Sequence, residues 1–284
     1  MSGAKGFVGR RLAERLRAAG HALVAVDREL EISDAALVTA SVAAAAPEAI
    51  VHLAAVSSSV AAREAPELAA RTNFLGARAV LEATRAAAAD ARVLLVTSGE
   101  IYGCGDAPFR EDDPLAPRTS YARTKACADL LGARHAADGL DVVRARPFNH
   151  TGPGQSPDFV APAFARQIAR IASGTSEPVL RVGNLDSVRD FLDLDDVLDA
   201  YQCLLDRAVA PGPYNVASGE GRRIGDLLDA LLEESGVSCR VETDPARLRP
   251  TDRAVGDASR LRAATGWRPR TPFRETLRRV LAAA

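Results

Sequence analysis

The sequence predicts an α/β protein built on a Rossmann-like, doubly wound parallel sheet, and two observations carry this prediction. Short apolar runs alternate with longer Ala/Leu/Arg/Glu stretches over roughly the first 150 residues. A glycine run, G-x-x-G-x-x-G, opens the first of these stretches. Strand–helix alternation with short connections is typical of parallel sheets with right-handed crossovers. A chain of 284 residues is long enough for one large domain with a smaller lobe.

The apolar runs predict the buried strands, and the stretches between them predict the helices, because their apolar residues recur at helical spacing. Strands are expected at residues 21–27, 49–56, 91–98 and 140–149. Helices are expected at residues 9–19, 66–89 and 120–138.

After Asn149 the rhythm changes to a loop rich in Gly and Pro, followed by shorter strands and helices. We therefore expect a main domain over residues 1–150 and a smaller lobe over 151–284. The boundary between them is soft, because strand-like "GPYNVAS" near residue 214 indicates that the second part interleaves with the sheet.

Composition excludes several classes of function. Hydrophobic residues make up 47% of the chain and the formal net charge is −1, so no global charge attracts nucleic acid or a membrane surface. The four cysteines are far apart and lack metal-ligand spacing. We expect reduced thiols, a cytoplasmic location and no metal site. The chain shows no signal peptide and no apolar run of membrane length.

The glycine run, Gly3, Gly6 and Gly9, has the pattern of a dinucleotide-binding turn. Glycines there allow a tight turn, close approach of backbone N–H groups to a pyrophosphate, and close helix–strand packing. Asp27 lies at the end of the next predicted strand, where an acid can bind the adenosine ribose hydroxyls. The neighbouring Arg28 is suited to a 2′-phosphate, so both NAD(H) and NADP(H) remain open as cofactors.

Such a turn needs a strand before it, yet only Met1 and Ser2 precede Gly3. In a sheet of order 3-2-1-4-5-6 that first strand lies at the centre. The first β-strand is apparently missing from the N-terminus, and we expect an apolar strand upstream of the sequence given. Without it, unpaired backbone and an apolar groove are expected at this place.

The segment "SYARTKACADLL" places Tyr121 and Lys125 four residues apart, on one face of a predicted helix. A nearby ammonium stabilises a phenolate, so we expect the pKa of Tyr121 to be lowered. Ser98 ends the strand before this helix, at the edge where open α/β sheets bind ligands. Its hydroxyl and the Tyr121 phenol are therefore predicted to meet the same substrate oxygen.

These residues and several further motifs resemble the extended short-chain dehydrogenase/reductase (NAD-dependent epimerase/dehydratase) family of nucleotide-sugar enzymes. The similar segments cover nearly the whole chain: "GAKGFVG", "IVHLAA", "TSGEIYG", "YARTK", "RPFNHTGPGQ", "GNLDSVRDF", "YNVASG" and "RPTD". Within the family, "RPFNHTGPGQ" with "GNLDSVRDF" is most similar to reductases that form GDP-6-deoxy-D-mannose (GDP-D-rhamnose) from GDP-4-keto-6-deoxy-D-mannose.

The resemblance implies roles for individual residues. The catalytic residues would be Ser98, Tyr121 and Lys125. The cofactor would be held by Gly3, Gly6, Phe7, Val8, Gly9, Asp27, Arg28, Glu31, Ile32, Leu53, Ala54, Ala55 and Pro147, together with Tyr121 and Lys125. The nucleotide sugar would contact Ser98, Gly99, Glu100, Asn149, Asn184, Arg189 and Arg249. Residues 1–150 would thus bind the cofactor, residues 151–284 would bind the substrate, and a homodimer is expected.

Two alternatives stay open beside the reductase. Glu100 lies two residues after Ser98, the offset at which sugar 4,6-dehydratases of this family carry a base, so a GDP-mannose 4,6-dehydratase, or another NDP-sugar dehydratase or epimerase, is one alternative. This chain reads Ser-Gly-Glu instead of the dehydratase Thr-Ser-Glu, and "TGPGQ" also favours the reductase. The second alternative is a non-catalytic, dinucleotide-binding sensor or interaction protein, which the intact Ser98, Tyr121 and Lys125 disfavour.

Overall fold

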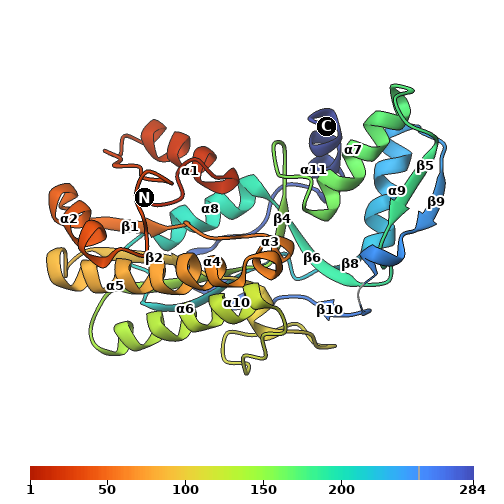
Figure 1. Ribbon diagram of the computed structural model, residues 1–284. Helices are drawn as coiled ribbons and strands as arrows, with labels where there is room; N and C mark the ends of the chain where they lie inside the picture. Colours follow the sequence, from red (N-terminus) through yellow and green to blue (C-terminus); the bar gives the residue numbers. More distant parts are fainter. Residues whose placement is uncertain (249) are drawn as a thin grey trace.

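The computed structural model describes residues 1–248 and 250–284. Its centre is a parallel sheet of order β1-β2-β3-β7 (Figure 1). The bounds of these strands are β1 (Ala49–His52), β2 (Arg92–Val96), β3 (Val142–Pro147) and β7 (Gly212–Val216). All three pairings are parallel, so the carboxyl ends of the strands meet at one edge of the sheet. The predicted α/β class and parallel sheet are confirmed.

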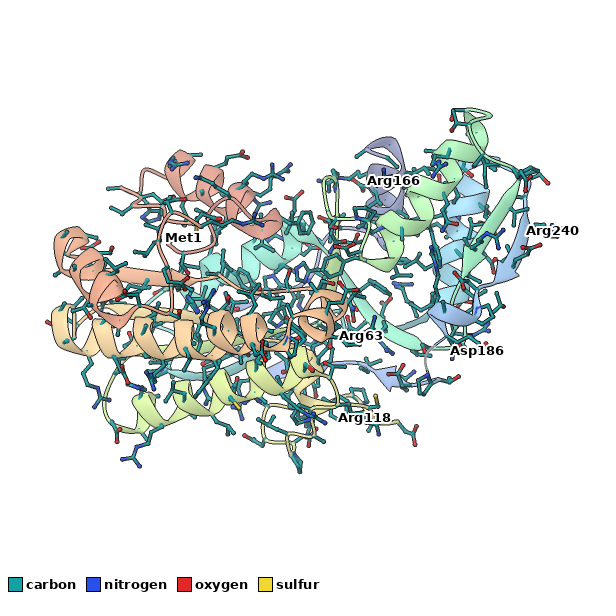
Figure 2. All side chains as sticks on the ribbon, in the orientation of Figure 1. Met1, Arg63, Arg118, Arg166, Asp186 and Arg240 are labelled. Atoms are coloured by element: carbon teal, nitrogen blue, oxygen red, sulfur yellow. The ribbon has the colours of Figure 1, made fainter. Side chains whose placement is uncertain are left out.

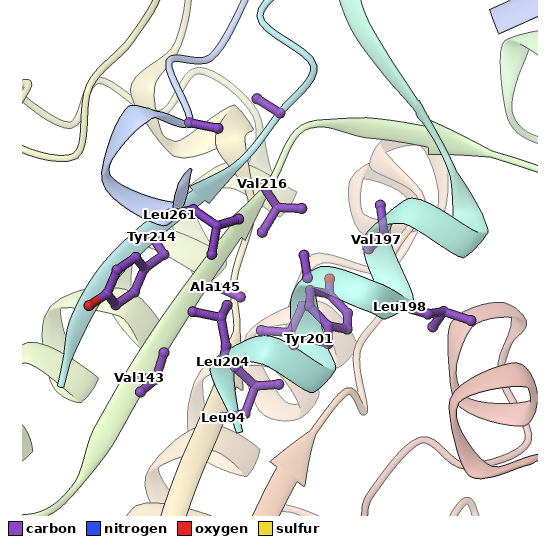
Figure 3. Close-up of a cluster of buried hydrophobic side chains, with 14 of the residues drawn as sticks. Leu94, Val143, Ala145, Val197, Leu198, Tyr201, Leu204, Tyr214, Val216 and Leu261 are labelled. Carbon is purple, nitrogen blue, oxygen red and sulfur yellow. The ribbon is translucent and has the colours of Figure 1, made fainter. Parts of the chain in front are cut away.

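Helices cover both faces of this sheet, as Figure 1 shows for α1 and α8 on one side and α5 and α6 on the other. Alternate residues of one strand point to opposite faces. Leu94 thus belongs to the cluster formed with α1, α8 and α10, and Leu95 to the cluster formed with α2, α5 and α6. Figure 3 shows the first cluster, in which Tyr201 and Leu204 of α8 pack over Leu94. The two packed faces place the sheet in the core of the main domain.

Helices α1 and α6 begin and end within two residues of the predicted ranges 9–19 and 120–138, and α2 and α3 lie where the sequence predicts no helix. The bounds of the main-domain helices are α1 (Phe7–Ala18), α2 (Ala35–Ala45), α3 (Ser59–Glu64), α4 (Pro66–Ala70), α5 (Gly76–Ala87), α6 (Ser120–Ala137), α8 (Leu194–Leu204) and α10 (Ser259–Thr265). The predicted helix over residues 66–89 is not continuous, because a π-helical turn, η1 (Arg71–Leu75), separates α4 from α5. Asn73 in this turn bonds the backbone of Val56 through both side-chain atoms, so the wider turn carries a tertiary contact.

The predicted strand over residues 21–27 is wrong in its extent. Of this segment only Val26 is paired, through a single parallel bridge to Ser2, which also bridges His52. Ser2 lies between Val26 and His52, and the pairing at Val26 consists of this one bridge. A groove of about 560 Å³ follows, lined mostly by apolar side chains such as Leu23, Val26 and Val51. Met1 lies beside α1 at this groove (Figure 2).

The lobe consists of short strands and three helices with their own apolar cluster, drawn at the right of Figure 1. Its elements are β4 (Asn149–Thr151), β5 (Val179–Val182), β6 (Val188–Asp193), β8 (Gly221–Arg223), β9 (Arg240–Thr243), β10 (Arg253–Ala254), η3 (Pro245–Arg247), α7 (Val160–Ala172), α9 (Ile224–Ser235) and α11 (Phe273–Ala282). Strand β6 pairs with β4, which follows β3 directly in the chain. The lobe is thereby attached at the carboxyl-end edge of the main sheet.

A buried ionic cluster joins α6 to the sheet. Asp129 of α6 is fully buried and accepts hydrogen bonds from Arg144, Arg146 and the hydroxyl of Thr97. Arg146 also donates to the hydroxyl of Tyr102. The Asp129 carboxylate therefore compensates the guanidinium groups of buried Arg146 and of mostly buried Arg144, and it fixes the helix that carries Tyr121 and Lys125.

We predict that Asp129→Ala lowers the free energy of unfolding by about 3–5 kcal/mol, because it leaves buried arginines without a counter-charge. The matched control is Asp138→Ala at the end of the same helix, where the carboxylate pairs with exposed Arg134. This surface pair is worth at most about 1 kcal/mol. Urea unfolding of both variants measures the difference, and equal losses would contradict the role given to Asp129.

Candidate active site

The glycine turn is formed by residues that leave no room for side chains. A Cβ at Gly9 would lie 2.0 Å from the carbonyl oxygen of Gly3, and Gly3 has a φ of +69°, which favours glycine. A Cβ at Gly3 would lie 2.7 Å from the backbone nitrogen of Ala54, in the loop after β1. The backbone of the turn thus packs directly against the backbone of the loop after β1, with no space for a side chain between them.

Helix α1 begins at this turn with Gly6 as its N-cap and no side chain capping its first N–H groups. Such a helix start favours an anionic phosphate. Phe7 and Val8 are partly buried against the main core cluster, and the Phe7 ring stacks on His150, with 6.4 Å between ring centroids. The residues present therefore fit the pyrophosphate of a dinucleotide, which would meet the free N–H groups of α1.

At the predicted adenosine end, Asp27 and the residues after it form an acidic loop. Asp27 is half-buried and Arg28 and Glu31 are exposed. The side chain of Ile32 is buried against Gly76 of α5, as part of the second core cluster. The assignment of Glu31 and Ile32 to the adenine region stays a prediction.

The three predicted catalytic residues meet at the carboxyl end of β2. Ser98 follows this strand, and its hydroxyl lies in hydrogen-bonding reach of the Tyr121 phenol. Tyr121 and Lys125 lie one turn apart on α6 and both are buried. The ammonium of Lys125 donates to the carbonyl oxygen of Val96, the last residue of β2, over 2.9 Å. Pro147 ends the adjacent strand, β3.

The predicted lowering of the Tyr121 pKa is wrong in direction. Burial, together with the negative charge of Glu100, raises the pKa of Tyr121, and only the bond with Ser98 acts in the opposite sense. Burial of Lys125 lowers the pKa of its ammonium to about 8. The reason is desolvation, which disfavours the charged form of each side chain. Tyr121 is consequently a phenol near neutral pH and suited to giving up a proton.

Glu100 lies beside this group in the short helix η2 (Gly99–Tyr102). Its carboxylate accepts a hydrogen bond from Ser59, over 3.2 Å. Although Glu100 is an exposed residue, desolvation of the carboxyl raises its pKa, and the Ser59 bond and the charge of Arg189 oppose this effect. The Glu100 carboxyl therefore keeps its proton to a higher pH than an ordinary glutamate does.

Gly99 shows why no side chain stands between Ser98 and Glu100. A Cβ at this position would lie 2.8 Å from the ring of Phe148. The same ring excludes a side chain at Gly256, where a Cβ would lie 2.4 Å away. The buried Phe148 ring is thus enclosed between two glycines, and any larger residue at 99 would displace it.

The predicted substrate residues of the lobe lie in hydrogen-bonded loops. Asn149 is half-buried at the start of β4. The amide nitrogen of Asn184 donates to Thr251 over 2.7 Å. Arg189 pairs with Asp252 over 2.6 Å. It also lies close enough to Glu100 for its positive charge to lower the pKa of that carboxyl. Arg249 lies outside the described residues.

Three residues that the sequence did not single out support the site. Ser59 bonds Glu100, Asp252 pairs with Arg189, and Asn73 joins the loop after β1 to Thr124 of α6, next to Lys125. In the part of the chain that the structure describes, no group of three or more His, Cys, Asp or Glu side chains is placed to hold a metal ion.

Comparison with known proteins shows similarity to enzymes that act on GDP-sugars. The family described as GDP-mannose 4,6 dehydratase matches residues 28–280. The chain is 38% identical over 241 residues to a GDP-6-deoxy-D-mannose reductase of Pseudomonas aeruginosa, covering 83% of this chain and 79% of that protein. It is 30% identical over 244 residues to GDP-mannose 4,6 dehydratase 2 of Arabidopsis thaliana, covering 83% of this chain and 65% of that one.

Solved structures with the same fold superpose on nearly the whole of this chain. RMD from Pseudomonas aeruginosa complexed with NADPH superposes with a TM-score of 0.87 at 33% identity, covering 99% of this chain and 96% of that one. A Thermus thermophilus UDP-glucose 4-epimerase in complex with NAD superposes with a TM-score of 0.88 at 28% identity and covers 99% and 97% of the two chains.

We predict that Lys125 titrates with a pKa of about 8. The chain contains two lysines, Lys5 and Lys125, so protein labelled with ¹³C at the lysine ε-carbon gives two signals, and Lys5→Arg assigns them. The folded-state pKa is depressed, so the ammonium carries its charge below pH 8 and loses it above. A Lys125 midpoint above pH 10 would contradict the effect of burial.

Proposed function

The chain belongs to the GDP-mannose 4,6 dehydratase family, and we propose that it is an NAD(P)H-dependent oxidoreductase that reduces the C4 ketone of a nucleotide sugar. The favoured substrate is GDP-4-keto-6-deoxy-D-mannose and the product GDP-D-rhamnose. The observation that carries this proposal is the Tyr121 phenol, which burial keeps protonated and which meets the Ser98 hydroxyl at the end of β2. The likeness to the reductase of Pseudomonas aeruginosa supports the same choice.

The roles of the residues follow from their chemistry. A bound nicotinamide dinucleotide supplies the hydride for this reaction. Tyr121 donates its phenolic proton to the C4 oxygen as the charge on that oxygen grows, and Ser98 donates a hydrogen bond to the same atom. Lys125 stabilises the phenolate left behind, because its ammonium is one helical turn away on the same helix.

The lobe would hold the nucleotide part of the substrate. Arg189 is a suitable partner for a diphosphate, because guanidinium groups bind phosphate oxygens in a bidentate manner. Asn149 and Asn184 would bond sugar and base oxygens, and Glu100 a sugar hydroxyl. Arg249 is assigned to the diphosphate from sequence alone.

A GDP-mannose 4,6-dehydratase is the second candidate, and Glu100 favours it. Its raised carboxyl pKa, beside Tyr121, is suited to removing a proton next to a ketone. Against it, Gly99 leaves no side chain between Ser98 and Glu100, and the Phe148 ring excludes one. A non-catalytic dinucleotide-binding protein is disfavoured by the grouping of Ser98 with Tyr121.

We predict that incubation with GDP-4-keto-6-deoxy-D-mannose and NAD(P)H oxidises the cofactor, and that Tyr121→Phe lowers kcat/KM by about 10²–10⁴-fold. The matched control is Tyr201→Phe, which removes a hydroxyl buried in the core cluster of Figure 3 and leaves turnover near that of the parent chain. Full turnover by Tyr121→Phe would contradict its role as proton donor. Conversion of GDP-mannose to a keto sugar without added reductant would favour the dehydratase.

The proposal includes a homodimer in the cytoplasm. Helix α6 lies beside α5, and its Leu130 is 59% exposed, which presents an apolar group to a second copy of the chain. Among the described residues no helix is long and apolar enough to cross a bilayer. The four cysteines are free thiols, in keeping with a reducing compartment.

We predict that the chain elutes with the mass of a dimer in size-exclusion chromatography with light scattering, and that Leu130→Asp shifts it toward the monomer. The reason is the charge placed on an apolar contact surface. Leu248→Asp, at a leucine of the lobe that is 47% exposed, is the matched control and leaves the mass unchanged. A monomeric parent chain would contradict the dimer.

A further inference from the structure

We propose that this chain prefers NADH to NADPH, and that the carboxylate of Asp27 makes the choice. The sequence leaves the two cofactors open, since Arg28 stands beside Asp27. The inference rests on the proposed function in one respect only, the assignment of the glycine turn to a dinucleotide.

The Asp27 carboxylate is fixed in front of the glycine turn. Its Oδ2 accepts a hydrogen bond from the backbone N–H of Lys5, inside the turn, over 2.7 Å. Its Oδ1 accepts one from the backbone N–H of Arg28 over 3.0 Å. Rotating the side chain away would break both bonds, so the negative charge stays at this place whichever dinucleotide arrives.

A fixed carboxylate distinguishes the two dinucleotides chemically. Each of its oxygens has acceptor capacity beyond the one backbone bond, so it can accept hydrogen bonds from ribose hydroxyls. In NADPH the 2′-hydroxyl is replaced by a phosphate with nearly two negative charges at neutral pH. That group offers the carboxylate no donor and repels it, since like charges in close contact cost several kcal/mol.

The neighbouring charges add to the repulsion. Glu29 and Glu31 follow Asp27 within the same exposed loop. Hydrogen bonds to each carboxylate, from its own backbone N–H in Glu29 and from Ser33 in Glu31, lower the pKa of these groups, so both are ionised at neutral pH. Asp27, Glu29 and Glu31 therefore give this loop three negative charges within five residues.

Two of the cations near this loop, Lys5 and Arg71, already form ion pairs. The ammonium of Lys5 contacts Glu29 over 3.0 Å, and Arg71 contacts Glu31 over 3.8 Å. Arg28 is the adjacent cation for which the described residues provide no ion pair, and its side chain is exposed. One exposed guanidinium contributes little in water, and it does not offset three carboxylates.

Isothermal titration of the full chain with NADH and with NADPH, without any sugar, tests the inference. The expected Kd for NADPH is at least tenfold higher than that for NADH. Asp27→Asn should bring the two Kd values within about threefold of each other, because it removes the fixed charge. Glu29→Gln should tighten NADPH several-fold, because it removes a second charge and releases Lys5.

Glu14→Gln is the matched control, since Glu14 is an exposed carboxylate two turns into α1, and its Kd ratio should equal that of the parent chain. Thermal denaturation checks that Asp27→Asn folds, and exposed Glu29 provides a second test that does not disturb the turn. Equal or tighter binding of NADPH by the parent chain overturns the inference while leaving the proposed function intact. An unchanged ratio in both variants overturns the assignment to Asp27. Failure of the parent chain to bind either dinucleotide overturns the proposed function and the inference with it.

Discussion

The parallel register of β1, β2 and β3 is the constraint on which the site depends. His52 pairs with Leu95, and Leu95 with Arg144, so the three strands end at nearly the same level. The segments that follow them carry Ala54, Ser98 and Asn149 respectively. These residues are 44 and 51 positions apart in the chain, yet the sheet places them at the same edge.

Desolvation is the common cause of the pKa shifts in the site. It keeps Tyr121 protonated at neutral pH, lowers the pKa of Lys125 to about 8 and raises the pKa of Glu100. The same physics requires the Asp129 cluster beneath the helix, because arginines removed from water need a counter-charge. Helix α6 therefore carries both Asp129 of the ionic cluster and the pair Tyr121 and Lys125.

The sequence predicts the sheet, most helices and the grouping of Ser98 with Tyr121 well, because apolar runs and helical spacing are local signals. It fails where tertiary context decides. The segment over residues 21–27 has the composition of a strand, but strand pairing depends on a neighbour, and only Ser2 provides one. The direction of the Tyr121 pKa shift depends on burial, which spacing along a helix does not reveal. The Arg189–Asp252 pair joins residues 63 positions apart, beyond the reach of any local pattern.

The measurement that tests the account most directly follows the hydride. GDP-4-keto-6-deoxy-D-mannose is incubated with the enzyme and nicotinamide cofactor deuterated at C4 of the dihydropyridine ring on either face, and the product is examined by NMR. The account predicts one deuterium at C4 of the sugar, delivered from a single face of the cofactor, with none elsewhere in the sugar. A product without deuterium at C4, or with deuterium transferred to another carbon, would contradict it.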